Sequence, residues 1–195
     1  METTIKILVV DDESRMRNDV NSFRLLAHFI GRDHRTWKKA ERGVAWHKYT
    51  ISIIESFRED GKLPDAWLGR YWWAHFVTAC TLFGTRKNKE EGYRYLERAF
   101  ELYAEWDKIP AGEALPVGCE EIYGGVKLIK GKDMLELPDG TREPFDAWLF
   151  NRTMGNAYYG MTAERGWEWF NSVRDEGLFG EYIERARKLM GSETD

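Results

Sequence analysis

Apolar residues recur at intervals of three and four along most of the chain, the spacing that places them on one face of a helix. Stretches rich in glycine and proline interrupt this pattern and mark the ends of the helices. The pattern predicts helical segments within residues 22–57 and near residues 65–83, 90–106, 145–161, 164–174 and 178–190. Asp65, which follows Pro64, is a candidate N-cap for the second segment. The run 4–10 is too short to assign to a strand or a helix.

A glycine- and proline-rich stretch separates the third segment from the fourth. Residues 126–129 and 134–137 are predicted to pair as a β-hairpin around Gly131, and residues 138–141 form a second turn. The side chains expected to face the helices are those of Leu128, Leu135 and Leu137. The hairpin is interpreted either as an arm for dimerisation or as a cover over the core.

Two short sequences occur twice in the chain. Asp-Ala-Trp-Leu at residues 65–68 returns at residues 146–149, and the acidic and aromatic sequence that begins at Glu90 has a counterpart that begins at Glu164. In each copy, the Asp-Ala-Trp-Leu sequence is expected to open one helix, and the acidic and aromatic sequence is expected to open the next. This arrangement predicts two helical hairpins. Residues 95–103, with the small Ala99 inside, resemble the second helix of a tetratricopeptide repeat.

Charge is distributed unevenly along the chain. Residues 22–50 carry seven Lys or Arg against Asp33 and Glu41, a local charge of +5, although the whole chain has a net charge of −4. A basic segment on an acidic body is typical of a module that binds a polyanion, although one solvated basic face would give the same composition. The two cysteines, Cys80 and Cys119, lie far apart and outside any zinc-binding pattern, so we expect reduced thiols and a cytoplasmic protein without a membrane-spanning segment.

The basic segment also contains an ordered series of small, apolar and capping residues. Ser22 can cap a short helix, Gly31 can end it, and Asp33 can cap a second helix that ends at Gly43. Two short helices joined by a tight glycine-containing turn form a helix-turn-helix unit. The series resembles the Cro/repressor (XRE-like) family over residues 20–58, and the matching positions are Ser22, Leu26, Ala27, Ile30, Gly31, Thr36, Trp37, Glu41 and Gly43.

This resemblance implies that the second helix enters the DNA major groove. The side chains expected at base edges are His34, Arg35, Lys38 and Lys39, and those expected at phosphates are Arg32, Arg42 and Lys48, with Thr36 either at a phosphate or in helix packing. Two features differ from the family: Phe23 replaces a polar residue, and the residues before Ser22 include several acids. These differences leave open a second interpretation, in which the helix-turn-helix shape is kept without DNA binding.

Other chemical patterns in the chain are weaker. Asp11 and Asp12, after an apolar run, look like the start of a response-regulator receiver, but no aspartate follows a later apolar strand to accept a phosphate. The aromatic helix that contains Tyr71, Trp72 and His75 is expected to be a core helix, and a groove for a ligand or partner is the alternative. The four histidines are scattered and no nucleophile or phosphate loop is present, so we expect neither a metal, a cofactor nor an enzyme.

The sequence therefore predicts a mainly α protein in two parts. Residues 1–60 would form the helix-turn-helix module, and residues 61–195 would form tetratricopeptide-like helical hairpins with one β-hairpin insertion. We expect a DNA-binding transcriptional regulator that acts as a homodimer, because one such module buries little DNA surface. The alternative is a scaffold of helical hairpins that binds a protein or peptide partner.

Overall fold

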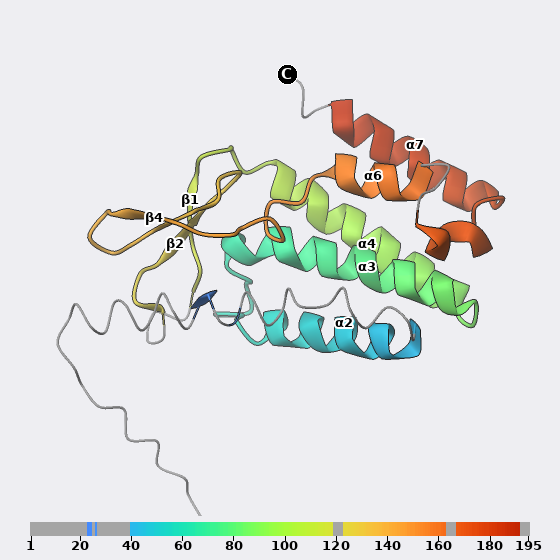
Figure 1. Ribbon diagram of the computed structural model, residues 1–195, viewed down its shortest axis with the longest axis horizontal. Helices are drawn as coiled ribbons and strands as arrows, with labels where there is room; N and C mark the ends of the chain where they lie inside the picture. Colours follow the sequence, from blue (N-terminus) through green and yellow to red (C-terminus); the bar gives the residue numbers. More distant parts are fainter. Residues whose placement is uncertain (1–22, 25, 27–39, 119–122, 163–166, 192–195) are drawn as a thin grey trace, which may run out of the picture.

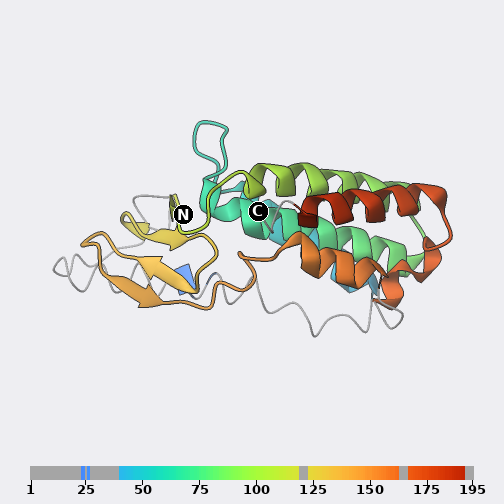
Figure 2. The same ribbon diagram turned by 90° about the horizontal axis from the view of Figure 1, so that it is seen from above.

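The computed structural model describes residues 23, 24, 26, 40–118, 123–162 and 167–191. Figures 1 and 2 show the helices lying side by side, with a small sheet at one end of the helical layer. The elements follow the order α2 (Ala40–Glu55), η2 (Asp65–Trp67), α3 (Leu68–Thr85), α4 (Lys89–Asp107), β1 (Ala114–Pro116), β2 (Lys127–Ile129), β3 (Met134–Glu136), β4 (Arg142–Pro144), α6 (Met154–Thr162), η3 (Glu168–Ser172) and α7 (Gly177–Gly191). The mainly helical class is confirmed, and a four-stranded antiparallel sheet is added to it.

Helix α3 forms the centre of the helical layer. It is buried at every residue from Leu68 to Phe83, because α2, α4 and η3 all contact it. A Cβ atom added at Gly69 would lie 1.9 Å from the carbonyl oxygen of Phe150, so glycine allows the segment before α6 to cross the start of α3. Glu97 on α4 accepts hydrogen bonds from Tyr182 (2.7 Å) and Arg185 (2.6 Å) and thereby ties α4 to α7.

The sheet has the strand order β1-β2-β3-β4. The predicted hairpin is confirmed as β2 and β3, and Gly131 and Gly140 adopt positive φ angles of 72° and 82° in the turns on either side of β3. Leu115, Leu128 and Leu135 form one buried row across three strands. The two outer strands were not predicted, because each ends in a proline and shows no alternating apolar pattern of its own.

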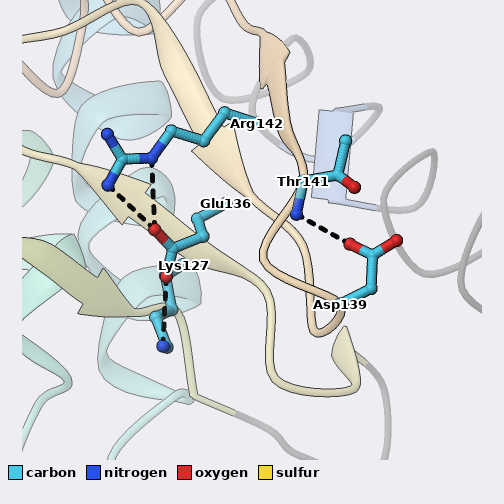
Figure 3. A network of polar contacts seen from close by, with 5 residues as sticks. All are labelled: Lys127, Glu136, Asp139, Thr141 and Arg142. Carbon is cyan, nitrogen blue, oxygen red and sulfur yellow. Dashed lines mark hydrogen bonds and ion pairs between the residues drawn. The ribbon is translucent and has the colours of Figure 1, made fainter.

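The exposed side of the sheet carries a polar row (Figure 3). Glu136 accepts hydrogen bonds from Lys127 (3.2 Å) and from Arg142 (3.0 Å), and these residues face each other across three neighbouring strands. In the turn before β4, the backbone N–H of Thr141 donates to the carboxylate of Asp139 at 2.8 Å. The row fixes the register of the outer strand with opposite charges.

The tryptophans mainly serve as core residues. Trp67, Trp72, Trp73 and Trp106 are at most 5% exposed, and Trp46, Trp148, Trp167 and Trp169 are half-buried. Phe57, in the turn after α2, stacks on Trp67 at a centroid distance of 4.5 Å. The aromatic core therefore continues across residue 60, where the sequence predicts a boundary between two units; the division itself stays a prediction.

Three local predictions are corrected by the structure. Asp65 is not a cap: the N-cap of η2 is Pro64 and that of α3 is Trp67, neither with a side-chain hydrogen bond. Residues 145–153 are not helical, and α6 begins at Met154, because this apolar segment packs over α3 instead of forming its own helix. The second Asp-Ala-Trp-Leu sequence therefore opens no helix, whereas the pairs α3–α4 and α6–α7 do pack as helical neighbours.

One of the last three predicted helices matches the observed element closely. The prediction at residues 178–190 corresponds to α7. Within the prediction at 164–174, residues 168–172 form the short 3-10 helix η3. Among the residues that the structure describes, no helix has the length and apolar character needed to cross a membrane. The run 4–10 and Cys119 lie outside the described residues.

Candidate functional site

Two of the eight residues predicted to contact DNA, Arg42 and Lys48, belong to the described part of the chain. Arg32, His34, Arg35, Thr36, Lys38 and Lys39 all lie outside the described residues. Arg42 is exposed on the first turn of α2, and Lys48 is half-buried two turns later on the same helix. The structure therefore describes residues near the two ends of the motif, and the second end lies within α2.

The first end of the motif is anchored to the sheet side of the molecule. Phe23 is fully buried, and its ring packs against Trp67, Tyr123, Phe145 and Phe150 at centroid distances of 5.3 to 5.9 Å. Arg24 donates to the carboxylate of Glu143 at 2.9 Å and to the carbonyl oxygen of Pro144 at 3.1 Å. Phe23 thus serves as a core residue, at a position where the Cro/repressor (XRE-like) family, which the sequence resembles, has a polar residue.

The second end of the motif differs from the prediction. The helix expected to end at Gly43 does not end there, because α2 runs from Ala40 through Gly43 to Glu55. A Cβ atom at Gly43 would lie 3.0 Å from Cγ2 of Thr81, so this glycine brings α2 close to α3 instead of stopping a helix. The neighbouring Glu41 forms an ion pair with Lys87, in the loop between α3 and α4.

Lys48 is engaged by acidic and aromatic side chains of α4. Its Nζ donates to Glu91 at 2.5 Å and lies 5.7 Å from the ring centroid of Tyr95. The hydrogen bond to Glu91 raises the pKa of Lys48, in spite of partial burial. The charge of Lys48 is therefore compensated within the protein.

The aromatic residues proposed as a ligand groove lie mainly in the core. Tyr71, Trp72 and His75 are 3%, 0% and 8% exposed, and Trp72 packs edge-on against Tyr103. Tyr71 and His75 are neighbours on α3 and meet edge to face at 4.7 Å. These burial values agree with a core helix and leave little of the three side chains accessible to a ligand.

Tyr71 and His75 are both held in their neutral forms. Tyr71 donates to Glu55 at 2.5 Å, and burial together with this bond raises the pKa of Tyr71 to about 12. Burial, aided by the charge of Arg98, lowers the pKa of His75 to about 3. The imidazole of His75 is therefore neutral at physiological pH and is unsuited to acid–base catalysis there.

An open pocket of about 270 Å³ lies where the end of α3 meets η3. Its lining combines two segments far apart in the sequence and consists of Phe83, Gly84, Arg86, Glu168, Trp169, Asn171 and Ser172. Ser172 donates to the carbonyl oxygen of Phe83 at 2.8 Å and joins the two segments. No local pattern could have predicted this pocket, because it depends on the tertiary contact between α3 and η3.

Arg152 is a second feature that sequence reasoning missed. Its guanidinium lies 3.9 Å from the ring centroid of Trp148 and 5.0 Å from that of Trp73. The spacing of four residues between Trp148 and Arg152 suits a contact on a helical turn, but this segment is not helical, so the spacing alone could not identify the contact. No group of three possible metal ligands occurs in the described part of the chain.

Comparison of the chain with protein-family models, with curated proteins and with solved structures found no match.

Proposed function

We propose that this protein is a DNA-binding transcriptional regulator, with residues 22–43 as its helix-turn-helix. The proposal rests on the helix-turn-helix pattern of the sequence and on which of the described cations in the basic segment are compensated. Arg24 and Lys48, at the two ends of that segment, form ion pairs with Glu143 and Glu91. Arg42 is exposed and forms no ion pair with a described residue. Of the described cations in this segment, Arg42 is therefore the one available to a partner. Arg32, Arg35, Lys38 and Lys39 lie outside the described residues and are candidates from the sequence.

These ion pairs reduce the set of residues that could contact DNA, compared with the set that the motif alone implies. Lys48 is removed from the set of phosphate contacts, because Glu91 already compensates it. The remaining candidates are Arg32, His34, Arg35, Thr36, Lys38, Lys39 and Arg42. Each phosphate that a Lys or Arg neutralises adds about 0.9 to the slope of log affinity against log salt concentration. We expect the protein to bind as a homodimer, since two modules bury enough DNA for specific binding.

The test is binding of the full-length protein to random-sequence duplex DNA at about 50 and 200 mM salt, measured by fluorescence anisotropy. We expect binding that weakens steeply with salt and a clear loss in the double variant Arg35→Ala plus Lys39→Ala. The matched control is Arg98→Ala plus Arg187→Ala, which removes the same charge from exposed ion pairs on α4 and α7. Equal losses of DNA affinity in the two double variants would mean that the affinity depends only on the net charge of the protein.

A second candidate function is a scaffold of tetratricopeptide-like hairpins that binds a protein or peptide partner. The burial of Phe23 and the passage of α2 through Gly43 favour it, because both differ from the DNA-binding family. In this case residues 23, 24 and 40–55 serve to complete the helical body. Folded full-length protein without salt-dependent affinity for DNA would reject the first proposal in favour of this one.

A further inference from the structure

Arg152 lies in the non-helical segment between β4 and α6, half-buried against two indole rings. Trp148 belongs to the same segment, whereas Trp73 belongs to α3, so the guanidinium is held between two parts of the fold. Trp167 packs edge-on against Trp73 at 5.9 Å and extends the aromatic wall. Trp148 and Trp167 are both half-buried and thus keep part of their surface accessible.

Within the described part of the chain, the guanidinium has aromatic contacts but no anionic partner. Among the described residues, no carboxylate forms an ion pair with Arg152 and no acceptor receives one of its hydrogens. Burial alone lowers the pKa of Arg152, with no opposing effect from a nearby acid. Other arginines of this fold, such as Arg24, Arg142 and Arg185, each donate to a glutamate. A half-buried cation without an anion is unfavourable, and binding an anion removes that cost.

The guanidinium of Arg152 carries its N–H donors in a planar, forked arrangement. Nε is enclosed without a hydrogen-bond partner, but the residue as a whole is only half-buried, so part of the side chain stays accessible. The guanidinium carbon lies over the indole of Trp148, 3.9 Å from the ring centroid, and this contact limits the orientations that the planar group can take. Two parallel donors of this kind match the two oxygens of a carboxylate.

We propose that Arg152, with Trp148 and Trp167 beside it, is a binding site for a carboxylate monoanion attached to an apolar or aromatic group. One cation matches one negative charge, whereas a phosphate dianion would leave an uncompensated charge in a half-buried place. The half-buried indoles provide the surface for the apolar part of the ligand. The site does not depend on DNA binding, and it goes beyond the function proposed above.

The experiment titrates full-length protein with phenylacetate and follows the side-chain N–H signal of Arg152 by NMR together with indole fluorescence. We expect a saturable shift of the Arg152 signal, with a dissociation constant of about 1 mM, as suits so small a ligand. The neutral phenylacetamide should not produce this shift. Phenyl phosphate at pH 8, where it carries about two negative charges, should bind more weakly than phenylacetate.

Three variants separate recognition from a structural role. Arg152→Gln should abolish binding, and Arg152→Lys, which keeps the charge but loses the planar fork, should weaken it by about tenfold. Arg187→Gln, at an exposed ion pair on α7, is the matched control and should bind as the wild type does. If Arg152→Gln is unstable, the NMR titration of the wild type remains the test. Unchanged binding in Arg152→Gln, equal or tighter binding of phenyl phosphate, or no shift of the Arg152 signal would overturn the proposal.

Discussion

Phe57 and Trp67 stack face to face, with ring centroids 4.5 Å apart and planes inclined by 5°. The pair joins the turn after α2 to the turn that begins α3. Both rings are buried, at 9% and 0% exposure, although the intervening residues 58–62 are all exposed. The stack therefore holds α2 against the rest of the core at the place where the chain turns back.

Removing one ring of this pair should destabilise the fold. We expect Phe57→Ala to lower the free energy of unfolding by about 3 kcal/mol, since it leaves a cavity beside Trp67. The measurement is urea unfolding followed by fluorescence. Tyr49→Ala, at a site 53% exposed on the preceding helix α2, should change the free energy by less than about 0.5 kcal/mol. Similar losses in both variants would contradict the importance of the stack.

Gly69 should tolerate no side chain. The new methyl group of Gly69→Ala would lie 1.9 Å from a backbone oxygen of Phe150, and a backbone atom cannot move as a flexible side chain can. We expect a loss of about 3 kcal/mol, at the upper end of the cost of overpacking. Gly180→Ala in α7 is the matched control, because nothing lies within 4 Å of its Cβ position. That variant should be more stable than the wild type by about 0.5 to 1 kcal/mol, and a loss there of the same size as at Gly69 would argue against a steric cause.

Ionisation of Tyr71 should lower the stability of the fold at alkaline pH. Its pKa is raised from 10 to about 12, so the folded state holds the phenolic proton more tightly than the unfolded state does. The stability gained in this way is complete below pH 10 and is lost as the pH rises from 10 toward 12. We expect Tyr71→Phe to reduce the fall in unfolding free energy over that interval.

Unfolding in urea at pH 9 and 11.5 measures this effect. Tyr159→Phe is the control, because Tyr159 is 69% exposed and its change should leave the alkaline decline unaltered. Tyr93 and Tyr182 also have raised pKa values, through burial and bonds to glutamates, so part of the decline should remain. An identical decline in the wild type and in Tyr71→Phe would contradict the prediction.

Cys80 should be inert in the folded protein. It is fully buried on α3, and burial raises the pKa of its thiol, which disfavours the reactive thiolate. In a Cys119→Ser background, we expect a thiol reagent to label Cys80 only as fast as the protein unfolds. The labelling rate in 0 to 6 M urea provides the measurement. Rapid labelling without denaturant, at the rate of a free thiol, would show that α3 opens readily.

Local sequence patterns predicted the elements whose stability is local. The hairpin of β2 and β3 was predictable because its turn needs a glycine such as Gly131 with positive φ. Strand β1 was missed because it pairs with β2 more than ten residues later and has no alternating pattern of its own. The helix predicted at 145–161 was too long, since buried residues such as Phe150 contact α3 while the backbone around them is irregular.

The candidate sites depend still more on tertiary structure. The sequence indicated Arg42 and Lys48 as equivalent cations, but Glu91 on α4 compensates only Lys48. Arg152 could not be singled out, because its second aromatic partner, Trp73, is 79 residues away in the sequence. Sequence patterns thus identify charged residues, whereas only the folded chain distinguishes compensated charges from available ones.

The burial of Phe23 has a practical consequence for experiments on this protein. A fragment that begins at residue 61 would lack a ring that fills space among Trp67, Tyr123, Phe145 and Phe150, and it would expose apolar surface that invites aggregation. A fragment of residues 1–60 would in turn carry Phe57 without Trp67 to cover it. Deletion studies that divide the chain there would therefore report misfolding instead of the function of either half.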